Sequence, residues 1–282
     1  MDALFLPWLW LVPLGLAVGT LGTLIGAGGG FILVPVLLLL YPHLAPEAVT
    51  AVSLTAVFFN ALSGSFAYSR MKRIDYKSGL LFAAAAVPGS LIGAWTTKFL
   101  PRGAFDLLFG SVLVLLATYL ALRTFRVPSK DEAPHEQSRL PLFKMLRTVV
   151  DWEHIQYVFS YNPILGVVVS VFIGFLSSLL GIGGGIFHVP LLATALNFPV
   201  HIATATSHFV LAIMTLSGTL VHIADGGWWH SLNIIVPLAL GVLGGAQWGA
   251  RLSNRVQGTL IIRVLSGTLV LVGIRLVYSS FS

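Results

Sequence analysis

The 282-residue chain contains no cysteine. A disulfide framework, a thiolate metal site and a cysteine nucleophile are therefore excluded. Charged side chains are also scarce, since they make up 9% of the residues and ordinary soluble domains carry about 25%. The chain is 56% hydrophobic, and its apolar residues form several long, continuous runs. This composition predicts an all-α polytopic membrane protein, because transmembrane strands would alternate apolar and polar residues.

Acidic residues are almost absent from the predicted spans. Glu47, Asp75 and Asp106 fall near span ends, where capping or solvation explains them. The carboxylate relay of many proton-driven transporters is therefore not expected. The chain also lacks a nucleotide-binding loop, an H-E-x-x-H motif and a G-x-S-G motif. We expect neither direct ATP coupling, nor an intramembrane enzyme, nor a bound cofactor.

The basic residues and the histidines indicate no further ligand. The formal net charge is +6, but the basic residues cluster in loops, where membrane topology explains them, and no nucleic-acid partner is expected. His188, His201 and His208 lie near one motif without a nearby carboxylate, which makes a poor metal site. A proton-coupling role for them is conceivable, although a satisfied interior histidine is the commoner case.

Two glycine-rich motifs divide the chain into matching halves. Gly22–Pro35 reads G-T-L-I-G-A-G-G-G-F-I-L-V-P, and Leu176–Pro190 reads L-S-S-L-L-G-I-G-G-G-I-F-H-V-P. Each motif belongs to a set of five apolar segments: 5–25, 30–41, 47–68, 78–98 and 104–122, then 163–180, 185–197, 200–222, 232–250 and 259–278. Paired helix breaks in an internally repeated membrane protein are typical of a transporter.

The predicted organisation has three parts. Residues 1–123 form membrane repeat 1 and residues 163–282 form membrane repeat 2. The polar segment 124–162 between them is predicted to be a cytoplasmic linker. Its second half, Leu140–Phe159, mixes apolar and charged residues and is expected to be an interfacial helix or, as an equal alternative, a loosely ordered loop.

The segments after the glycine motifs are too short to cross a membrane alone. Segments 30–41 and 185–197 hold about a dozen residues, or roughly 18 Å of helix, against a hydrocarbon layer of about 30 Å. We therefore expect each repeat to contain a re-entrant or broken helical hairpin with its glycines deep in the bilayer. A hairpin followed by three spans crosses an odd number of times, so the two repeats should have inverted topology.

The distribution of basic residues supports this topology. The loop with Arg70, Lys72, Arg73 and Lys77 is strongly basic and is placed inside, whereas its counterpart His222–His230 has no Lys or Arg. Inverted repeats put 13 of the 16 Lys and Arg residues inside, and a parallel arrangement puts 11 there. The linker is then cytoplasmic and both termini are extracytoplasmic.

The glycines can present backbone donors to an anion. A helix N-terminus carries unpaired N–H groups and the positive end of the helix dipole, and glycine allows close approach of a ligand. The alternative is that the glycines only permit close helix packing. Polar residues nearby could complete a cavity. The predicted substrate-binding residues are Gly28, Gly29, Gly30, Ser53, Asn60, Gly183, Gly184, Gly185, Thr206, Ser207, His208 and Gln247.

The motifs T-L-I-G-A-G-G-G at Thr23–Gly30 and L-L-G-I-G-G-G at Leu179–Gly185, each followed by a proline, resemble the two hallmark motifs of the TauE/SafE sulfite exporters, within the 4-toluene sulfonate uptake permease family. The resemblance covers nearly the whole chain except the linker. It implies transport of sulfite, sulfoacetate or related sulfur oxyanions and organosulfonates across a bacterial or archaeal inner membrane.

Several alternatives remain open at this point. The chain could be an alternating-access exporter, an anion channel, or an importer of another small anion. The expected partners are a small sulfur-containing anion and the lipid bilayer. The small-residue faces Gly89–Gly93 and Gly241–Gly249 could serve either packing within the chain or a homodimer contact.

Overall fold

A computed structural model describes residues 8–126, 144–253, 270 and 273–274, and these are mostly helical. The chain separates into two compact units, Met1–Phe99 with Met145–Arg255, and Leu100–Lys144 with Val256–Ser282. In the shorter unit, α6 (Arg102–Arg126) begins with an ion pair in which Arg102 Nε lies 2.9 Å from Asp106. The predicted segment 259–278 lies outside the described residues apart from three positions. The candidate site lies in the longer unit.

The longer unit contains short and long helices and one pair of strands. Its elements are α2 (Leu11–Ile25), α3 (Gly30–Leu40), α4 (Pro46–Arg70), α5 (Tyr76–Thr97), β1 (Met145–Val150), β2 (Gln156–Tyr161), α7 (Pro163–Leu180), α8 (Gly185–Pro190), the π-helical turn η2 (Leu191–Ala195), α9 (Val200–Ala224), the 3-10 turn η3 (Gly227–Ser231) and α10 (Leu232–Leu252). Among the described residues, α4, α5, α7, α9 and the segment Gly227–Leu252 are long and apolar enough to cross a membrane.

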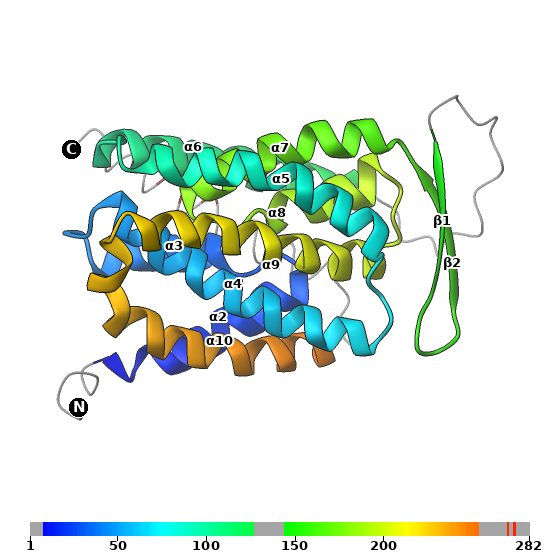
Figure 1. Ribbon diagram of the computed structural model, residues 1–282, viewed down its shortest axis with the longest axis horizontal. Coiled ribbons are helices and arrows are strands. Elements are labelled where there is room, and N and C mark those ends of the chain that lie inside the picture. Colours follow the sequence, from blue (N-terminus) through cyan, green and yellow to red (C-terminus); the bar gives the residue numbers. More distant parts are fainter. Residues whose placement is uncertain (1–7, 127–143, 254–269, 271–272, 275–282) are drawn as a thin grey trace. The chain divides into compact units, whose positions relative to one another are not determined.

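Helices α4 and α9 form an antiparallel pair at the centre of this unit. Thr50 near the start of α4 lies 3.4 Å from His222 near the end of α9. A methyl group at Gly64, late in α4, would meet the imidazole ring of His208, early in α9. Figure 1 shows the helices of this unit side by side, with α4 and α9 between the other pairs.

Two further helix pairs flank the centre, and both depend on glycine. A methyl group at Gly241 of α10 would lie 2.9 Å from the Cα atom of Gly15 in α2. A methyl group at Gly93 of α5 would lie 3.0 Å from the backbone nitrogen of Leu179 in α7. The sequence allowed either packing within the chain or a homodimer contact for these two small-residue faces. In the structure both faces pack within the chain, because glycine has no side chain and lets the helix backbones approach closely.

Both glycine motifs lie at the turn of a helical hairpin. Trp8, before α2, lies 5.7 Å from Tyr41, after α3, measured between ring centroids, so the chain turns back between these helices. Tyr161, before α7, lies 5.1 Å from Phe198, which follows η2. Because α4 and α9 run in opposite directions and follow these hairpins, the hairpins open at opposite ends of the unit.

The linker corrects one prediction. Within 140–159, the described residues form no interfacial helix but a hairpin in which β1 pairs antiparallel with β2, from Met145 opposite Tyr161 to Val150 opposite Gln156. The physical reason is composition: the strands are rich in Val, Thr, Tyr and Phe, which favour extended backbone. The turn between them contains His154 with φ 62°, and Asp151 accepts hydrogen bonds from the backbone of Glu153 and Ile155.

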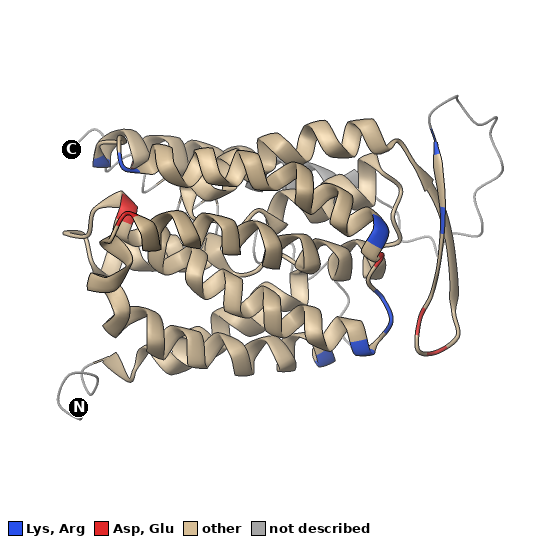
Figure 2. Ribbon diagram, in the orientation of Figure 1, with Lys and Arg blue, Asp and Glu red and all other residues tan. Residues whose placement is uncertain are grey.

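The two ends of the longer unit differ in charge. One end carries the loop Met71–Asp75 between α4 and α5 together with the β-hairpin, and is here called the basic end. The opposite end carries Asp225 after α9 and the turn η3, where Trp228 Nε1 donates to Thr55 Oγ1 at 2.9 Å. Figure 2 shows that the Lys and Arg residues of this unit lie at helix ends, in the α4–α5 loop and on the hairpin.

Candidate functional site

The two glycine loops have the same backbone conformation. Gly26, Gly28 and Gly29 have φ values of 82°, 78° and 87°, and their counterparts Gly181, Gly183 and Gly184 have values of 72°, 87° and 76°. Residues with a side chain rarely adopt this left-handed region, which explains why glycine occupies the equivalent positions in both motifs. All of these glycines are buried.

The loops meet each other directly, half-way along α4 and α9. A methyl group at Gly30, the first residue of α3, would overlap the carbonyl oxygen of Ile182. A methyl group at Gly185, the first residue of α8, would lie 2.7 Å from the Cα atom of Ala27. An oxyanion therefore has no room at this contact unless the loops separate.

The contact pairs opposite ends of helix dipoles. The N-terminus of α3 lies against the carbonyl groups just after the C-terminus of α7, and the N-terminus of α8 lies against the carbonyl of Gly26, just after the C-terminus of α2. The partial positive charge at each helix start thus faces partial negative charge from the other hairpin. This arrangement lowers the electrostatic cost of burying four helix ends together, namely the starts of α3 and α8 and the ends of α2 and α7.

Several backbone donors remain available in the loops. Ala27 and Gly28 donate to the carbonyl of Gly22, and Ile182 donates to that of Ser177. In contrast, the following amide N–H groups have no acceptor among the described residues: Gly29, Gly30, Gly184 and Gly185. Buried donors of this kind favour a polar guest, because an unsatisfied amide in an apolar environment costs about 1–3 kcal/mol.

Side chains from α4 and α9 hold the loop carbonyls in place. Ser53 Oγ donates to the carbonyl oxygen of Gly181 at 2.6 Å. Ser207 Oγ, at the equivalent position of α9, donates to the carbonyl oxygen of Gly26 at 3.2 Å. Asn60 Nδ2 donates to the carbonyl oxygen of Gly28 at 3.0 Å. Three of the predicted side chains therefore bond to carbonyl groups of the loops and, in the part of the chain that the structure describes, they do not accept hydrogen bonds from the amide N–H groups of the loops.

A buried polar cluster lies beside the first loop. Thr23 Oγ1 donates to Asn60 Oδ1 at 3.1 Å and lies 3.3 Å from His208 Nε2. Tyr68 donates its hydroxyl hydrogen to the carbonyl oxygen of Thr23 at 2.9 Å. Sequence reasoning selected Asn60 and His208 but missed Thr23 and Tyr68. A threonine one turn before the glycines was the available signal, whereas Tyr68 could be placed only by the packing of α4.

Two predicted residues lie elsewhere. Thr206 Oγ1 accepts a hydrogen bond from the backbone N–H of Asp75 at 3.0 Å, at the basic end. Gln247 Nε2 donates to the hydroxyl and carbonyl oxygens of Ser63, each at 2.8 Å, and joins α10 to α4. Neither side chain has a hydrogen bond to a glycine loop among the described residues.

Two further buried histidines each lie near a single hydroxyl group. His188 Nε2 lies 3.3 Å from Ser170 Oγ, and His222 Nε2 lies 3.4 Å from Thr50 Oγ1. Over the part of the chain that the structure describes, no group of three or more His, Cys, Asp or Glu side chains could hold a metal ion.

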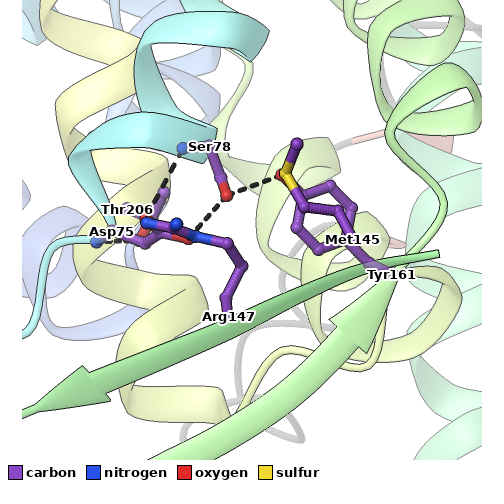
Figure 3. A network of polar contacts seen from close by, with 6 residues as sticks. All are labelled: Asp75, Ser78, Met145, Arg147, Tyr161 and Thr206. Carbon is purple, nitrogen blue, oxygen red and sulfur yellow. Dashed lines mark hydrogen bonds and ion pairs between the residues drawn. The ribbon is translucent and has the colours of Figure 1, made fainter.

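The basic end contains a second buried polar network, around Asp75 (Figure 3). Arg147 of β1 forms a bidentate ion pair with this carboxylate, through Nη2 at 2.6 Å and Nε at 3.0 Å. Ser78 donates to the same carboxylate at 2.5 Å and lies 2.7 Å from the hydroxyl of Tyr161. Burial raises the pKa of Asp75, but hydrogen bonds from Arg147 and Ser78 outweigh it, so the pKa of this carboxyl lies below its ordinary value.

This network attaches the β-hairpin to the helices. Arg73 lies 3.5 Å from Asp151 of the hairpin turn, and Trp152 donates its backbone N–H to the carbonyl oxygen of Met71 at 3.1 Å. An apolar cluster completes the attachment, with Phe159 and Phe198 rings 4.3 Å apart between centroids. The hairpin therefore joins the α4–α5 loop to the start of α7 and the segment before α9.

Comparison with known proteins supports one assignment. The family described as sulfite exporter TauE/SafE matches residues 11–276. The chain is 33% identical to "Probable membrane transporter protein YunE" of Bacillus subtilis (strain 168), over 95% of this chain and 96% of that protein. It is 26% identical to "Probable membrane transporter protein MJ0441" of Methanocaldococcus jannaschii, over 94% and 93%. No solved structure matches the chain significantly. The chain belongs to the sulfite exporter TauE/SafE family.

Proposed function

We propose that this chain is a secondary transporter that exports sulfite, sulfoacetate or a related small organosulfonate or sulfur oxyanion by alternating access. The family description and the names of the relatives support a membrane transporter of this type. The observation that carries the proposal is the direct contact of two glycine loops, each with free amide donors, in the middle of the longer unit. We place the substrate between these loops.

We further propose that the two hairpins are re-entrant and that the repeats have inverted topology in a bacterial or archaeal inner membrane. The antiparallel α4–α9 pair and the hairpins that open at opposite ends support this arrangement. Basic residues favour a cytoplasmic location for the basic end. The linker hairpin is then cytoplasmic and both termini are extracytoplasmic.

In this mechanism the direct contact of the loops is the closed conformation, which has no room for an oxyanion. The carbonyl groups of each loop face the helix start of the other hairpin, where they take the place of a negative charge. When the two loops move apart, the amides of Gly29, Gly30, Gly184 and Gly185 would turn to an oxyanion. Gly28, whose amide already donates to the Gly22 carbonyl, and Gly183 would allow the anion to approach the backbone closely. Ser53, Asn60 and Ser207 would hold the loop backbones in the orientation that binding needs, with His208 supporting Asn60 through Thr23.

A neutral set of donors suits export. The side chains that hold the loop carbonyls, Ser53, Asn60 and Ser207, are uncharged, so the site compensates a negative charge through dipoles. An anion held in this way can be released readily. An inside-negative potential favours anion export by about 2.3 kcal/mol per charge for each 100 mV, so export needs no coupling ion.

Flux from proteoliposomes tests the proposal. Vesicles loaded with radiolabelled sulfite or sulfoacetate should release it in a saturable manner when an inside-negative potential is imposed. Asn60→Ala should reduce the rate, because the Gly28 carbonyl loses its donor, whereas Gln247→Ala should leave it nearly unchanged. Flux without saturation would indicate an anion channel, and inward transport of another anion would indicate an importer. No flux above empty vesicles for any such anion would contradict the proposal.

A further inference from the structure

An open apolar groove runs along the outside of α4 and α9, toward the basic end. It encloses about 440 Å³, within the usual range of small-molecule sites of about 300–1,000 Å³. Its lining includes the large side chains of Phe58, Leu62, Phe66, Tyr76, Phe209 and Leu216. Phe66 is 55% exposed and Leu62 is 49% exposed, so the groove faces outward from two candidate membrane-spanning helices.

The length of the groove matches one leaflet of a bilayer. Its residues on α4 extend from Phe58, near the middle of the helix, to Ser69, one residue before its end. At 1.5 Å per residue this distance is about 16 Å, roughly half of a 30 Å hydrocarbon layer. An extended acyl chain of the leaflet at the basic end would therefore occupy the groove from the headgroup level to the midplane.

Unbalanced positive charge lies where this groove ends. Asp75 is neutralised by Arg147, and the hairpin acids Asp151 and Glu153 both lie against Arg73. Three exposed cations have no ion pair with any described residue: Arg70, Lys72 and Lys77. Arg70 lies over the ring of the groove residue Phe66, 4.4 Å from its centroid, and Lys77 follows the groove residue Tyr76.

We propose that this groove binds one acyl chain of an anionic phospholipid, whose phosphate group is held by Arg70, Lys77 and Lys72. The apolar lining accounts for the chain, and the excess of cations at one end accounts for the charge of the headgroup. Clustered basic residues next to a membrane-spanning helix attract anionic lipids, and a guanidinium group recognises phosphate through paired hydrogen bonds. The proposal rests on the membrane placement given above but not on the identity of the substrate.

Lipid binding to the purified full-length protein tests the proposal. Retention of phosphatidylglycerol and of phosphatidylcholine with identical acyl chains is compared by native mass spectrometry, and the shift in melting temperature by each lipid is measured in detergent. We expect phosphatidylglycerol to be retained preferentially and to raise the melting temperature more. Arg70→Gln with Lys77→Gln should weaken its binding by about fivefold per removed charge.

Two further variants separate the groove from general surface charge. Arg251→Gln removes an exposed cation at the end of α10, which does not line the groove, and should leave lipid preference unchanged. Ala212→Phe fills the groove without changing charge and should reduce retention, with Ser69→Phe as a second filling variant. Equal retention of the two lipids by the unmodified protein would overturn the proposal. So would a lipid-independent dimer that the filling variants disrupt, because a second copy would then be the occupant.

Discussion

Ser53 of α4 donates a hydrogen bond to the carbonyl oxygen of Gly181, 2.6 Å away, and Ser207 of α9 donates to the carbonyl oxygen of Gly26 at 3.2 Å. Each bond joins the long helix of one half of the chain to the glycine loop of the other half. The two halves therefore fix the position of each other's loops, and these serines connect the loops to the central pair of helices.

Ser53→Ala should lower the free energy of unfolding more than Ser207→Ala does. Removing Ser53 leaves a buried carbonyl without its donor, a loss of about 1–3 kcal/mol, and its hydrogen bond is the shorter of the two. Melting temperatures in detergent would measure the difference. Ser69→Ala is the control. Among the described residues this exposed hydroxyl bonds only to the nearby carbonyl of Phe66, so its removal should have almost no effect. Equal melting temperatures for all three variants would contradict the assignment.

Gly30→Ala and Gly185→Ala should abolish transport and reduce stability by about 1–3 kcal/mol, the usual cost of overpacking. Both glycines have ordinary helical φ values, so strain would come only from the methyl group pressing on the opposite loop. Gly244→Ala is a matched control, since its methyl group would lie 3.6 Å from Leu16 and the helix gains about 0.5–1 kcal/mol from alanine.

Flux and melting temperature should be measured together for these three variants. If Gly30→Ala behaved like Gly244→Ala in both measurements, the loops would not meet as described. If it retained transport but lost stability, the glycines would serve packing alone, and the proposed substrate site would be wrong.

Arg147→Gln should destabilise the protein more than Asp75→Asn. Without its guanidinium partner, the buried Asp75 carboxylate keeps its desolvation cost, and breaking a buried pair in this way costs about 3–5 kcal/mol. Asp75→Asn instead leaves the partly exposed Arg147 with access to water and keeps an acceptor for Ser78. Melting temperatures at pH 7 would rank the two variants, and the reverse order would contradict the buried ion pair.

The same pair predicts a dependence on pH. The folded-state pKa of Asp75 lies below its unfolded value of about 3.9. Its stabilisation is therefore complete at pH values above the unfolded pKa and is lost as the pH falls through the lowered folded pKa. A melting-temperature series from pH 7 down to about pH 2 should show an acid-side loss that is smaller in Asp75→Asn. Parallel curves for the two proteins would show that another group causes the loss.

The sequence predicted where helices begin and end better than it predicted which segments contact each other. The segment 163–180 coincides with α7 because length, apolar composition and the following glycine define a helix locally. The β-hairpin was missed because the mixture of apolar and charged residues in Leu140–Phe159 was interpreted as an interfacial helix. The composition of these strands favours extended backbone, but their attachment to Asp75 and Arg73, which lie about 70 residues earlier, leaves no local pattern in the sequence.

The same limit applies to the candidate site. Glycine spacing predicted both loops, since positive φ is a local requirement that only glycine meets easily. Side chains were predicted less well: Thr206 and Ser207 are neighbours, but adjacent residues of a helix point about 100° apart. Ser207 therefore contacts the Gly26 carbonyl while Thr206 contacts Asp75. The rotation of α9 about its axis, which decides between them, follows from packing on α4.

The absence of native cysteine allows a direct test of the proposed topology. Lys72→Cys places a thiol at the basic end, and Trp229→Cys places one at the opposite end, where the Trp229 side chain is 59% exposed. In intact cells, a membrane-impermeant maleimide should label Trp229→Cys at once and Lys72→Cys only after permeabilisation. The parent protein is the control, since it has no thiol to label. Labelling of both variants from the same side would contradict a membrane between the two ends. Immediate labelling of Lys72→Cys, with Trp229→Cys labelled only after permeabilisation, would still place a membrane between the two ends but would reverse the proposed orientation. The positive charge of loop 70–77 would then not determine how the chain inserts.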